Sequence, residues 1–405
     1  LRVVGNTLAY SGDAAAAPSS PTKAAGSSPV KLPTGPWEYD AVYRPDASTA
    51  EVYLDWPASI ARSVAEGCNG CVLVYGPEGA GKSHTMRGTA SDPGVALRAA
   101  RDVFTAAAAQ AAQRESVVRA AFFQVHGEEL ADLLDARNES LVMRAEATSG
   151  AVVKGCAERI VRDEDDVEAI LDEGERTRRA IDGAEESRAH TILRLTVESA
   201  ERGGSRNSSA RVGRLYLVEV ANVGREHIEA ERAGRLAEPG DIINRSLVTL
   251  GLVVSKLGRR KRGVQAYGTD KGISRIPYRD SMLTRILRAP LGGNARTVVI
   301  CALTPAPWNV EENKSTLRFA ASCMRVRNAV RVNEVTSSSD SFFLRQAGAA
   351  AALRAELAQA HAEGDGDGTQ ANHPDLEQKL LGLRQALLDE EREEHTRRLA
   401  ASRAP

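Results

Sequence analysis

The chain of 405 residues carries a formal net charge of −1, so it has no overall field that would draw it to nucleic acid or to a membrane surface. Hydrophobic residues make up 42% and charged residues 26% of the sequence, which is typical of a soluble protein large enough for one α/β domain and an appendage. Its five scattered cysteines do not form a secreted disulfide framework, and no apolar run approaches the roughly 18–20 residues that span a bilayer. We therefore expect an intracellular protein of the cytoplasm.

The predicted elements begin with a short strand over residues 1–10, followed at 11–36 by a low-complexity insertion rich in Ala, Pro, Ser and Gly that has too little apolar content to pack. From Trp37 onward, strand-like and helix-like segments alternate in the manner of a mixed α/β sheet. We expect strands at 71–75, 116–125, 190–199 and 211–220, the last two joined as a hairpin across Gly203-Gly204. We expect helices at 95–113, 164–173, 240–257, 279–288 and 311–329.

Beyond residue 333 the composition changes again. We expect a linker and an Ala-rich helix over 334–374, and a charged helix over 375–405. Four leucines of that last segment follow a heptad seam, namely Leu376, Leu380, Leu383 and Leu387. The seam covers barely two heptads, whereas a coiled-coil dimer usually needs three or four. The pattern fits a short coiled coil, which would make a homodimer, and a solvated helix equally well.

A phosphate-binding motif occupies residues 76–83, where Gly-Pro-Glu-Gly-Ala-Gly-Lys-Ser matches the Walker A pattern between a buried strand and a helix. The glycines let backbone N–H groups surround phosphates, Lys82 neutralises the β and γ oxygens, and the Ser83 hydroxyl can reach Mg²⁺. The nucleotide-binding residues predicted here are Gly76, Pro77, Glu78, Gly79, Ala80, Gly81, Lys82 and Ser83. A P-loop alone does not choose among GTPases, small-molecule kinases, transport ATPases and motors.

Segments along residues 37–333 resemble, in order, the motifs of the kinesin motor domain. The earlier ones are Trp37-Glu-Tyr-Asp-Ala-Val-Tyr43 for F-x-F-D-x-V-F, Gly67-Cys-Asn-Gly70 for G-x-N-G, the P-loop with its flanks, and residues 122–134 for the family's strand and helix Y-x-E-I-Y-N-E-x-x-x-D-L-L. The later ones are I-I-N-R-S-L at 242–247, I-P-Y-R-D-S-M-L-T-R at 276–285, L-G-G-N at 291–294, S-T-L-R-F-A at 315–320 and the closing N-x-V-x-x-N at 328–333. An unrelated P-loop transferase would leave the matches at 242–333 unexplained.

The resemblance implies a P-loop NTPase fold, in which a central mixed β-sheet is flanked by helices, over a motor domain at residues 1–333 with a helical extension after it. It implies an ATP hydrolase that uses Mg²⁺ and couples turnover to movement along microtubules, and hence a place on the cytoskeleton. His84 matches the position where the family sets a ring against adenine. The family's other adenine wall, R-x-R-P, has no match before Leu1, so either the sequence begins late or part of that pocket is missing.

The first departure from the family lies in switch I. The family motif is N-x-x-S-S-R-S-H, and residues 183–190 here are Gly-Ala-Glu-Glu-Ser-Arg-Ala-His. Ser187 and Arg188 remain, and the resemblance implies a catalytic role for both. Glu186 replaces the serine that helps to hold Mg²⁺. A carboxylate beside a triphosphate is repelled by it unless the carboxylate turns outward or binds the metal itself.

Switch II departs further, because the family's D-L-A-G-S-E is matched by Glu-Val-Ala-Asn-Val-Gly at 219–224. Glu219 can still approach Mg²⁺ together with Ser83, and we assign it as a catalytic and metal-binding residue. Asn222 replaces the glycine whose N–H meets the γ-phosphate. Gly224 removes the carboxylate that would pair with Arg188, although Glu226 could substitute for it.

These substitutions leave two hypotheses open. Phosphoryl transfer depends on positioning and charge stabilisation, so lost switch closure would cost on the order of 10²–10⁴ in rate. An ATP-hydrolysing motor is favoured by the intact Lys82, Ser83, Ser187 and Arg188. A non-catalytic microtubule-binding protein, which keeps the nucleotide or the fold as a structural element, is favoured by the unusual Glu186, Asn222 and Gly224.

A local basic patch begins at Arg259-Arg-Lys-Arg262. Such a charge run is usually a solvated loop, but in a kinesin-like frame this loop faces the microtubule, whose acidic tails attract it in a salt-sensitive way. The predicted microtubule-binding residues are Lys256, Arg259, Arg260, Lys261, Arg262, Arg275, Tyr278, Arg279 and Arg285. Met282 replaces a family lysine, which should weaken the surface slightly. Nucleic acid and membranes are not expected partners.

Overall fold

A computed structural model describes residues 2–4, 7–9, 37–138, 141–146, 150–182, 189–202, 209–222, 242–259 and 276–336. The chain divides into two units, of which residues 1–202 and 211–334 form the first and residues 203–210 and 335–405 the second. The expected insertion at 11–36 and the charged helix at 375–405 lie outside the described ranges. So does the segment at 334–374, apart from residues 334–336 with the short strand β13 (Glu334–Val335).

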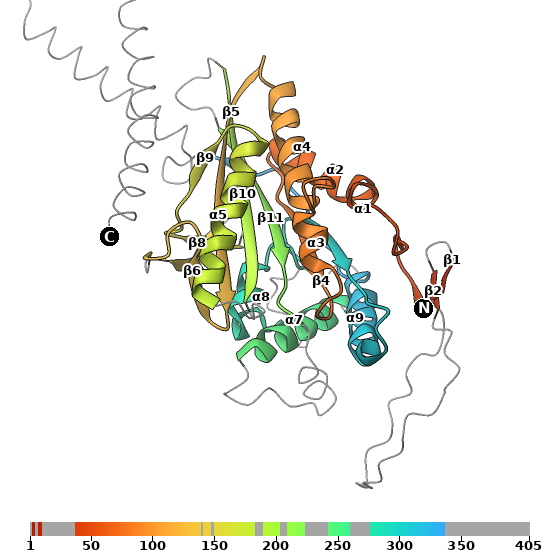
Figure 1. The fold of residues 1–405 in the computed structure, drawn as a ribbon. Helices are drawn as coiled ribbons and strands as arrows, with labels where there is room; N and C mark the ends of the chain where they lie inside the picture. Colours follow the sequence, from red (N-terminus) through yellow and green to blue (C-terminus); the bar gives the residue numbers. More distant parts are fainter. Residues whose placement is uncertain are drawn as a thin grey trace, which may run out of the picture. The chain divides into compact units, whose positions relative to one another are not determined.

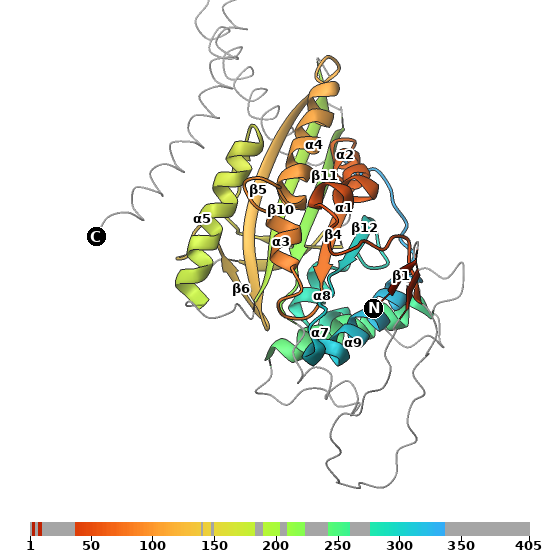
Figure 2. The same cartoon turned by 45° about the vertical axis from the view of Figure 1, so that its right-hand side comes forward.

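The main sheet of the first unit is mixed and has the strand order β12-β4-β11-β10-β5-β6, with β9 paired to β5. Its strands are β4 (Gly70–Tyr75), β5 (Arg114–His126), β6 (Glu129–Asp132), β9 (Arg159–Val161), β10 (His190–Glu201), β11 (Ala210–Glu219) and β12 (Arg296–Cys301). β4 runs parallel to β11 and to β12, and the remaining pairs are antiparallel. Figure 2 shows this order across the sheet.

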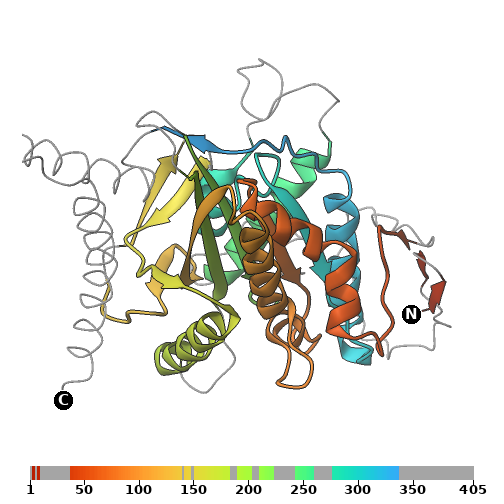
Figure 3. The same ribbon diagram turned by 90° about the horizontal axis from the view of Figure 1, so that it is seen from above.

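Helices cover both faces of the sheet (Figures 1 and 3). One face carries α2 (Pro57–Ala65), α4 (Val95–Ala109) and α5 (Glu164–Asp182), preceded by α1 (Thr49–Asp55) and α3 (Lys82–Arg87). The other face carries α7 (Ile242–Gly258), α8 (Met282–Ile286) and α9 (Val310–Cys323), with the 3₁₀ turns η1 (Tyr278–Asp280) and η2 (Pro307–Asn309) before α8 and α9. The described residues contain no helix long and apolar enough to cross a bilayer.

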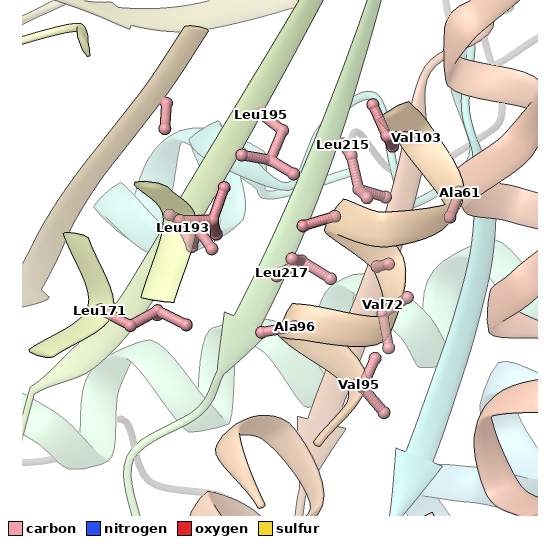
Figure 4. Close-up of a cluster of buried hydrophobic side chains, with 14 of the residues drawn as sticks. Ala61, Val72, Val95, Ala96, Val103, Leu171, Leu193, Leu195, Leu215 and Leu217 are labelled. Atoms are coloured by element: carbon pink, nitrogen blue, oxygen red, sulfur yellow. The ribbon is translucent and has the colours of Figure 1, made fainter. Parts of the chain in front are cut away.

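The core follows from the two-residue period of the strands. Val72 and Val74 of β4 lie in the cluster under α2, α4 and α5, whereas the intervening Leu73 lies in the cluster under α7, α8 and α9. Figure 4 shows the first cluster, to which Leu215 and Leu217 of β11 also belong. Each such leucine contributes roughly 1.5–3 kcal/mol on burial. Because both faces are covered, all six residues of β4 are buried, and the loop that follows this strand starts from a rigid base.

Two small sheets share no strand pairing with the main one. β1 (Arg2–Val4) and β2 (Thr7–Ala9) form an antiparallel hairpin that β3 (Trp37–Glu38) extends, so the single strand expected over residues 1–10 is wrong. β7 (Val142–Glu146) pairs with β8 (Gly150–Lys154).

The expected α/β class, the strands near 71–75, 116–125, 190–199 and 211–220, and the pairing of the last two as antiparallel neighbours are confirmed. Three other expectations are wrong. The helix expected within 122–134 is strand β6, which pairs with β5. The helix expected at 279–288 is divided at Ser281 into η1 and α8. The helix expected at 311–329 ends at Cys323.

The closing N-x-V-x-x-N motif ties the segment after α9 to the sheet. Asn328 accepts a hydrogen bond from the Gly292 N–H at 2.7 Å and donates to the Ala295 carbonyl at 2.7 Å. Asn333 donates to the carbonyls of Gly67 and Val212, each at 2.9 Å. These amides pair with backbone groups that would otherwise be buried without partners. They thereby fix residues 328–333, which belong to no long helix or strand, against the sheet.

Candidate nucleotide site

The P-loop turn at residues 76–83 leaves the buried end of β4 and enters α3 at Lys82. Gly76 has φ +154°, and a Cβ at this position would lie 2.3 Å from the Ala302 carbonyl oxygen. Gly81, the N-cap of α3, has φ +91°. Both positions therefore require glycine, Gly81 for its backbone conformation and Gly76 also for the closeness of its neighbour. The glycines of the Walker A pattern at these two positions are therefore explained by the shape of the turn.

Lys82 lies folded back over this turn and is only 6% exposed. Its Nζ donates to the carbonyls of Gly76 at 3.0 Å and Pro77 at 2.8 Å, and to Oδ1 of Asn222 at 2.7 Å. An ammonium group has three donors, and these three acceptors are enough to satisfy them. A buried cation is stable only when its donors are satisfied in this way, so a phosphate that takes one of these donors must displace a protein oxygen.

Ser83 and Glu219 meet beside the lysine, where the Ser83 hydroxyl donates to Oε1 of Glu219. Glu219 is the last residue of β11, the parallel neighbour of β4, and pairs in register with Val74. The carboxyl ends of parallel strands lie at one edge of a sheet, which is why ligands collect there. A hydroxyl and a carboxylate are oxygen donors of the kind that Mg²⁺ prefers, so these two side chains fit the expected metal.

No group of three or more His, Cys, Asp or Glu side chains suited to a metal occurs among the described residues. In P-loop sites, Mg²⁺ takes only one or two protein side chains and completes its shell with phosphate oxygens and water. His84 follows on α3, and its side chain is exposed next to the loop. Its expected contact with adenine stays a prediction.

His190, at the start of β10, lies next to the residues that follow β11 and is 1% exposed. Its Nδ1 accepts a hydrogen bond from the Ala221 N–H at 2.9 Å, and its Nε2 lies 2.7 Å from Oγ of Ser246 on α7. Burial, with a smaller contribution from the charge of His126, lowers the pKa of His190 to about 3. His190 is the last residue of the switch I match at 183–190, a pattern that predicts no role for it. Only its contacts reveal one.

Several predicted site residues fall outside the described ranges. These are the switch I residues Glu186, Ser187 and Arg188, and Gly224 and Glu226 of switch II. The catalytic assignments of Ser187 and Arg188 therefore stay predictions. The structure brings together Lys82, Ser83, Glu219 and Asn222, from two separate stretches of sequence.

Those predicted microtubule-binding residues that the structure describes lie on or beside α7 and α8. Arg259 and Arg279 are exposed, and Lys256 and Arg285 are half-buried. Tyr278 is different, because it is 8% exposed and its hydroxyl donates to the Leu291 carbonyl. Its ring packs inside the cluster under α7, α8 and α9. Arg260, Lys261, Arg262 and Arg275 are not among the described residues.

Comparison with known proteins gives consistent results. A family model described as "Kinesin motor domain" matches residues 13–326. The kinesin-like protein KIN-7N of Arabidopsis thaliana is 35% identical over 367 residues, covering 89% of this chain and 42% of that protein. The kinesin-1 heavy chain of Rattus norvegicus is 33% identical over 315 residues, covering 76% of this chain and 31% of that protein. The chain thus spans less than half the length of these relatives.

Two solved structures share the fold. One is a fast kinesin, which matches with a TM-score of 0.62 and 30% identity over 76% of this chain and 85% of that one. The other is a KIF14 dimer with AMP-PNP in complex with a microtubule, which matches with a TM-score of 0.59 and 31% identity over 72% of this chain and 81% of that one.

Proposed function

Since the chain belongs to the kinesin motor domain family, we propose that it hydrolyses Mg-ATP at the P-loop and couples that turnover to movement along microtubules. The observation that carries this proposal is the convergence of Lys82, Ser83 and Glu219 at the carboxyl edge of β4 and β11. That edge is where a triphosphate and its metal bind in P-loop proteins.

Each of these side chains has a separate task. Lys82 exchanges a protein acceptor for a phosphate oxygen, and the two carbonyls of the turn hold the ammonium in place during that exchange. Ser83 and Glu219 would hold Mg²⁺, which would neutralise charge on the β- and γ-phosphates. The glycine turn lets backbone N–H groups face the phosphates without a side chain in between.

Hydrolysis is proposed to be slow, because switch II is altered at the position that meets Lys82. A glycine at 222 would present only backbone, whereas Asn222 accepts a hydrogen bond from Nζ at 2.7 Å. This amide competes with the γ-phosphate for the same donor. Together with the loss of a carboxylate at Gly224, it reduces the rate by on the order of 10²–10⁴ relative to an intact switch.

The switch argument is tested by the double variant Asn222→Gly, Gly224→Glu. It should raise ATP turnover by at least about tenfold, while Asn222→Gly alone should mainly tighten ATP binding because Lys82 is released. Lys82→Ala serves as the control that abolishes binding. A double variant that turns over no faster than the wild type would refute the switch argument.

Binding to the acidic surface of a microtubule is proposed for the face that carries α7 and α8. The exposed Arg259 and Arg279 and the half-buried Lys256 and Arg285 give this face positive charge. Attraction between solvated charges is screened beyond roughly 8 Å at physiological ionic strength. Binding should therefore weaken as salt increases.

Co-sedimentation with microtubules over a salt series checks this surface. Arg279→Ala with Arg285→Ala should lower affinity several-fold, whereas Arg176→Ala should not. The matched control Arg176 is exposed on α5, on the opposite side of the sheet. Binding that fails even at low salt would refute the microtubule proposal.

The second candidate, a microtubule-binding protein without catalysis, is favoured by the same Lys82–Asn222 hydrogen bond. It predicts microtubule binding with no phosphate release under any condition. A homodimer through residues 375–405 is a further proposal, and those residues lie outside the described ranges.

A further inference from the structure

His190 occupies a junction between three elements. It begins β10, faces the segment that follows β11, and contacts α7 through Ser246, which is itself 1% exposed. A buried imidazole is most often a core residue whose hydrogen bonds serve only the packing. The direction and the partners of each hydrogen bond decide whether it also links two moving parts of the protein.

The tautomer of the ring follows from its partners. A backbone N–H can only donate, so Nδ1, which receives the Ala221 N–H at 2.9 Å, carries no proton. The neutral ring then has its proton on Nε2 and donates it to Oγ of Ser246 at 2.7 Å. Burial keeps the ring neutral by lowering its pKa to about 3. Both nitrogens are therefore committed to partners on different elements.

The Ala221 N–H belongs to the segment that faces the nucleotide. Glu219, two residues earlier, accepts a hydrogen bond from Ser83, and Asn222, the next residue, accepts one from Lys82. Any shift of this segment when Lys82 or Ser83 changes partners must move the Ala221 N–H against a ring that is also bonded to α7. Coupling through packed elements requires such a contiguous set of contacts.

We propose that His190 is a positioning residue that couples the segment after β11 to helix α7, so that nucleotide state and the position of α7 depend on each other through one imidazole ring. The proposal rests on the proposed motor function and names a residue through which microtubule binding at α7 would regulate turnover. If His190 had only a structural role, replacing it would lower the stability of the protein and leave the stimulation of turnover by microtubules intact.

Three single variants separate the two ends of the bridge. In His190→Asn, the side-chain Oδ1 stands where Nδ1 was and can still accept from Ala221, but the side chain is too short for Ser246. In His190→Gln, the amide nitrogen replaces Nε2 and can reach Ser246 but not Ala221. Ser246→Ala removes the acceptor on α7. Thr249→Val is the matched control, because Thr249 is a buried hydroxyl residue of the same helix whose Oγ1 has no hydrogen-bond partner among the described residues.

The measurement is phosphate release with and without microtubules, together with binding of a fluorescent ATP analogue and the melting temperature. His190→Asn, His190→Gln and Ser246→Ala should each retain analogue binding and lower the ratio of stimulated to basal release by about tenfold, the factor expected for one hydrogen bond. Thr249→Val should keep the wild-type ratio. Combining His190→Asn with Ser246→Ala should lower the ratio no further than either change alone, because both break one bridge.

Two outcomes overturn the inference while leaving the proposed function in place. One is a wild-type ratio in Ser246→Ala and His190→Asn. The other is strictly additive losses in the combined variant. A wild-type protein without any microtubule stimulation is a different result, because it overturns the proposed function and the inference with it. The melting temperatures show whether a variant is merely unstable, and in that case the remaining variants decide.

Discussion

Acidification should destabilise the protein through His190, because its ring is buried and neutral in the fold. An unfolded histidine titrates near pKa 6.5, whereas burial lowers the folded pKa of His190 to about 3. Between these values the unfolded state binds the extra proton, so stability is greatest above about pH 6.5 and falls as the pH decreases towards 3. From about pH 7 to about pH 5 the loss from this one group is about 2 kcal/mol.

Urea unfolding of the wild type and of His190→Asn at a series of pH values isolates this effect. The amide of His190→Asn does not titrate, so contributions from all other histidines and carboxylates cancel in the difference between the two proteins. The wild type should lose about 2 kcal/mol more than the variant over this interval, although it is more stable at neutral pH. Equal losses in the two proteins would refute the assignment of a buried neutral ring.

Three further changes test other parts of the structure. Gly174→Ala should cost about 1–3 kcal/mol in urea unfolding despite the better helix propensity of alanine, because its Cβ would lie 2.1 Å from the Phe122 ring. Glu158→Gln should cost about 3 kcal/mol, since it leaves the buried Arg194 guanidinium, now 2.5 Å from Glu158, without its counter-charge. Met282→Lys should tighten co-sedimentation with microtubules several-fold at low salt and by less at high salt.

Sequence reasoning succeeded where local chemistry decides the structure. The P-loop is an example, because the positive φ of Gly81 and the close approach at Gly76 leave few alternatives to glycine in that turn. The antiparallel pairing of β10 with β11 is another, since two β-rich runs flank a Gly-Gly pair.

The failures occurred where distant pairing decides. Residues 129–132 form strand β6 because they pair with β5, for example Asp132 with Phe123, and no local pattern revealed that partner. The break at Ser281 between η1 and α8 was missed for a similar reason. The Thr284 hydroxyl there donates to the carbonyls of Tyr278 and Ser281. The spacing of apolar residues along a helix does not predict such contacts.

The same limit applies to the candidate site. Lys82 and Glu219 could be assigned from motifs, because a phosphate site requires those residue types. The Lys82–Asn222 and His190–Ser246 hydrogen bonds could not be predicted, since their partners lie 140 and 56 positions apart in the sequence. Tyr278 illustrates the opposite error, as a residue expected at the microtubule surface has a buried side chain.

Whether this P-loop drives a motor is decided by phosphate release with and without microtubules, under ATP saturation and at low salt. We expect microtubules to accelerate release by the wild type, and Asn222→Gly with Gly224→Glu to raise the stimulated rate by at least about tenfold. Release that is unchanged by microtubules, in a protein that binds both ATP and microtubules, would contradict the claim that this P-loop drives a motor.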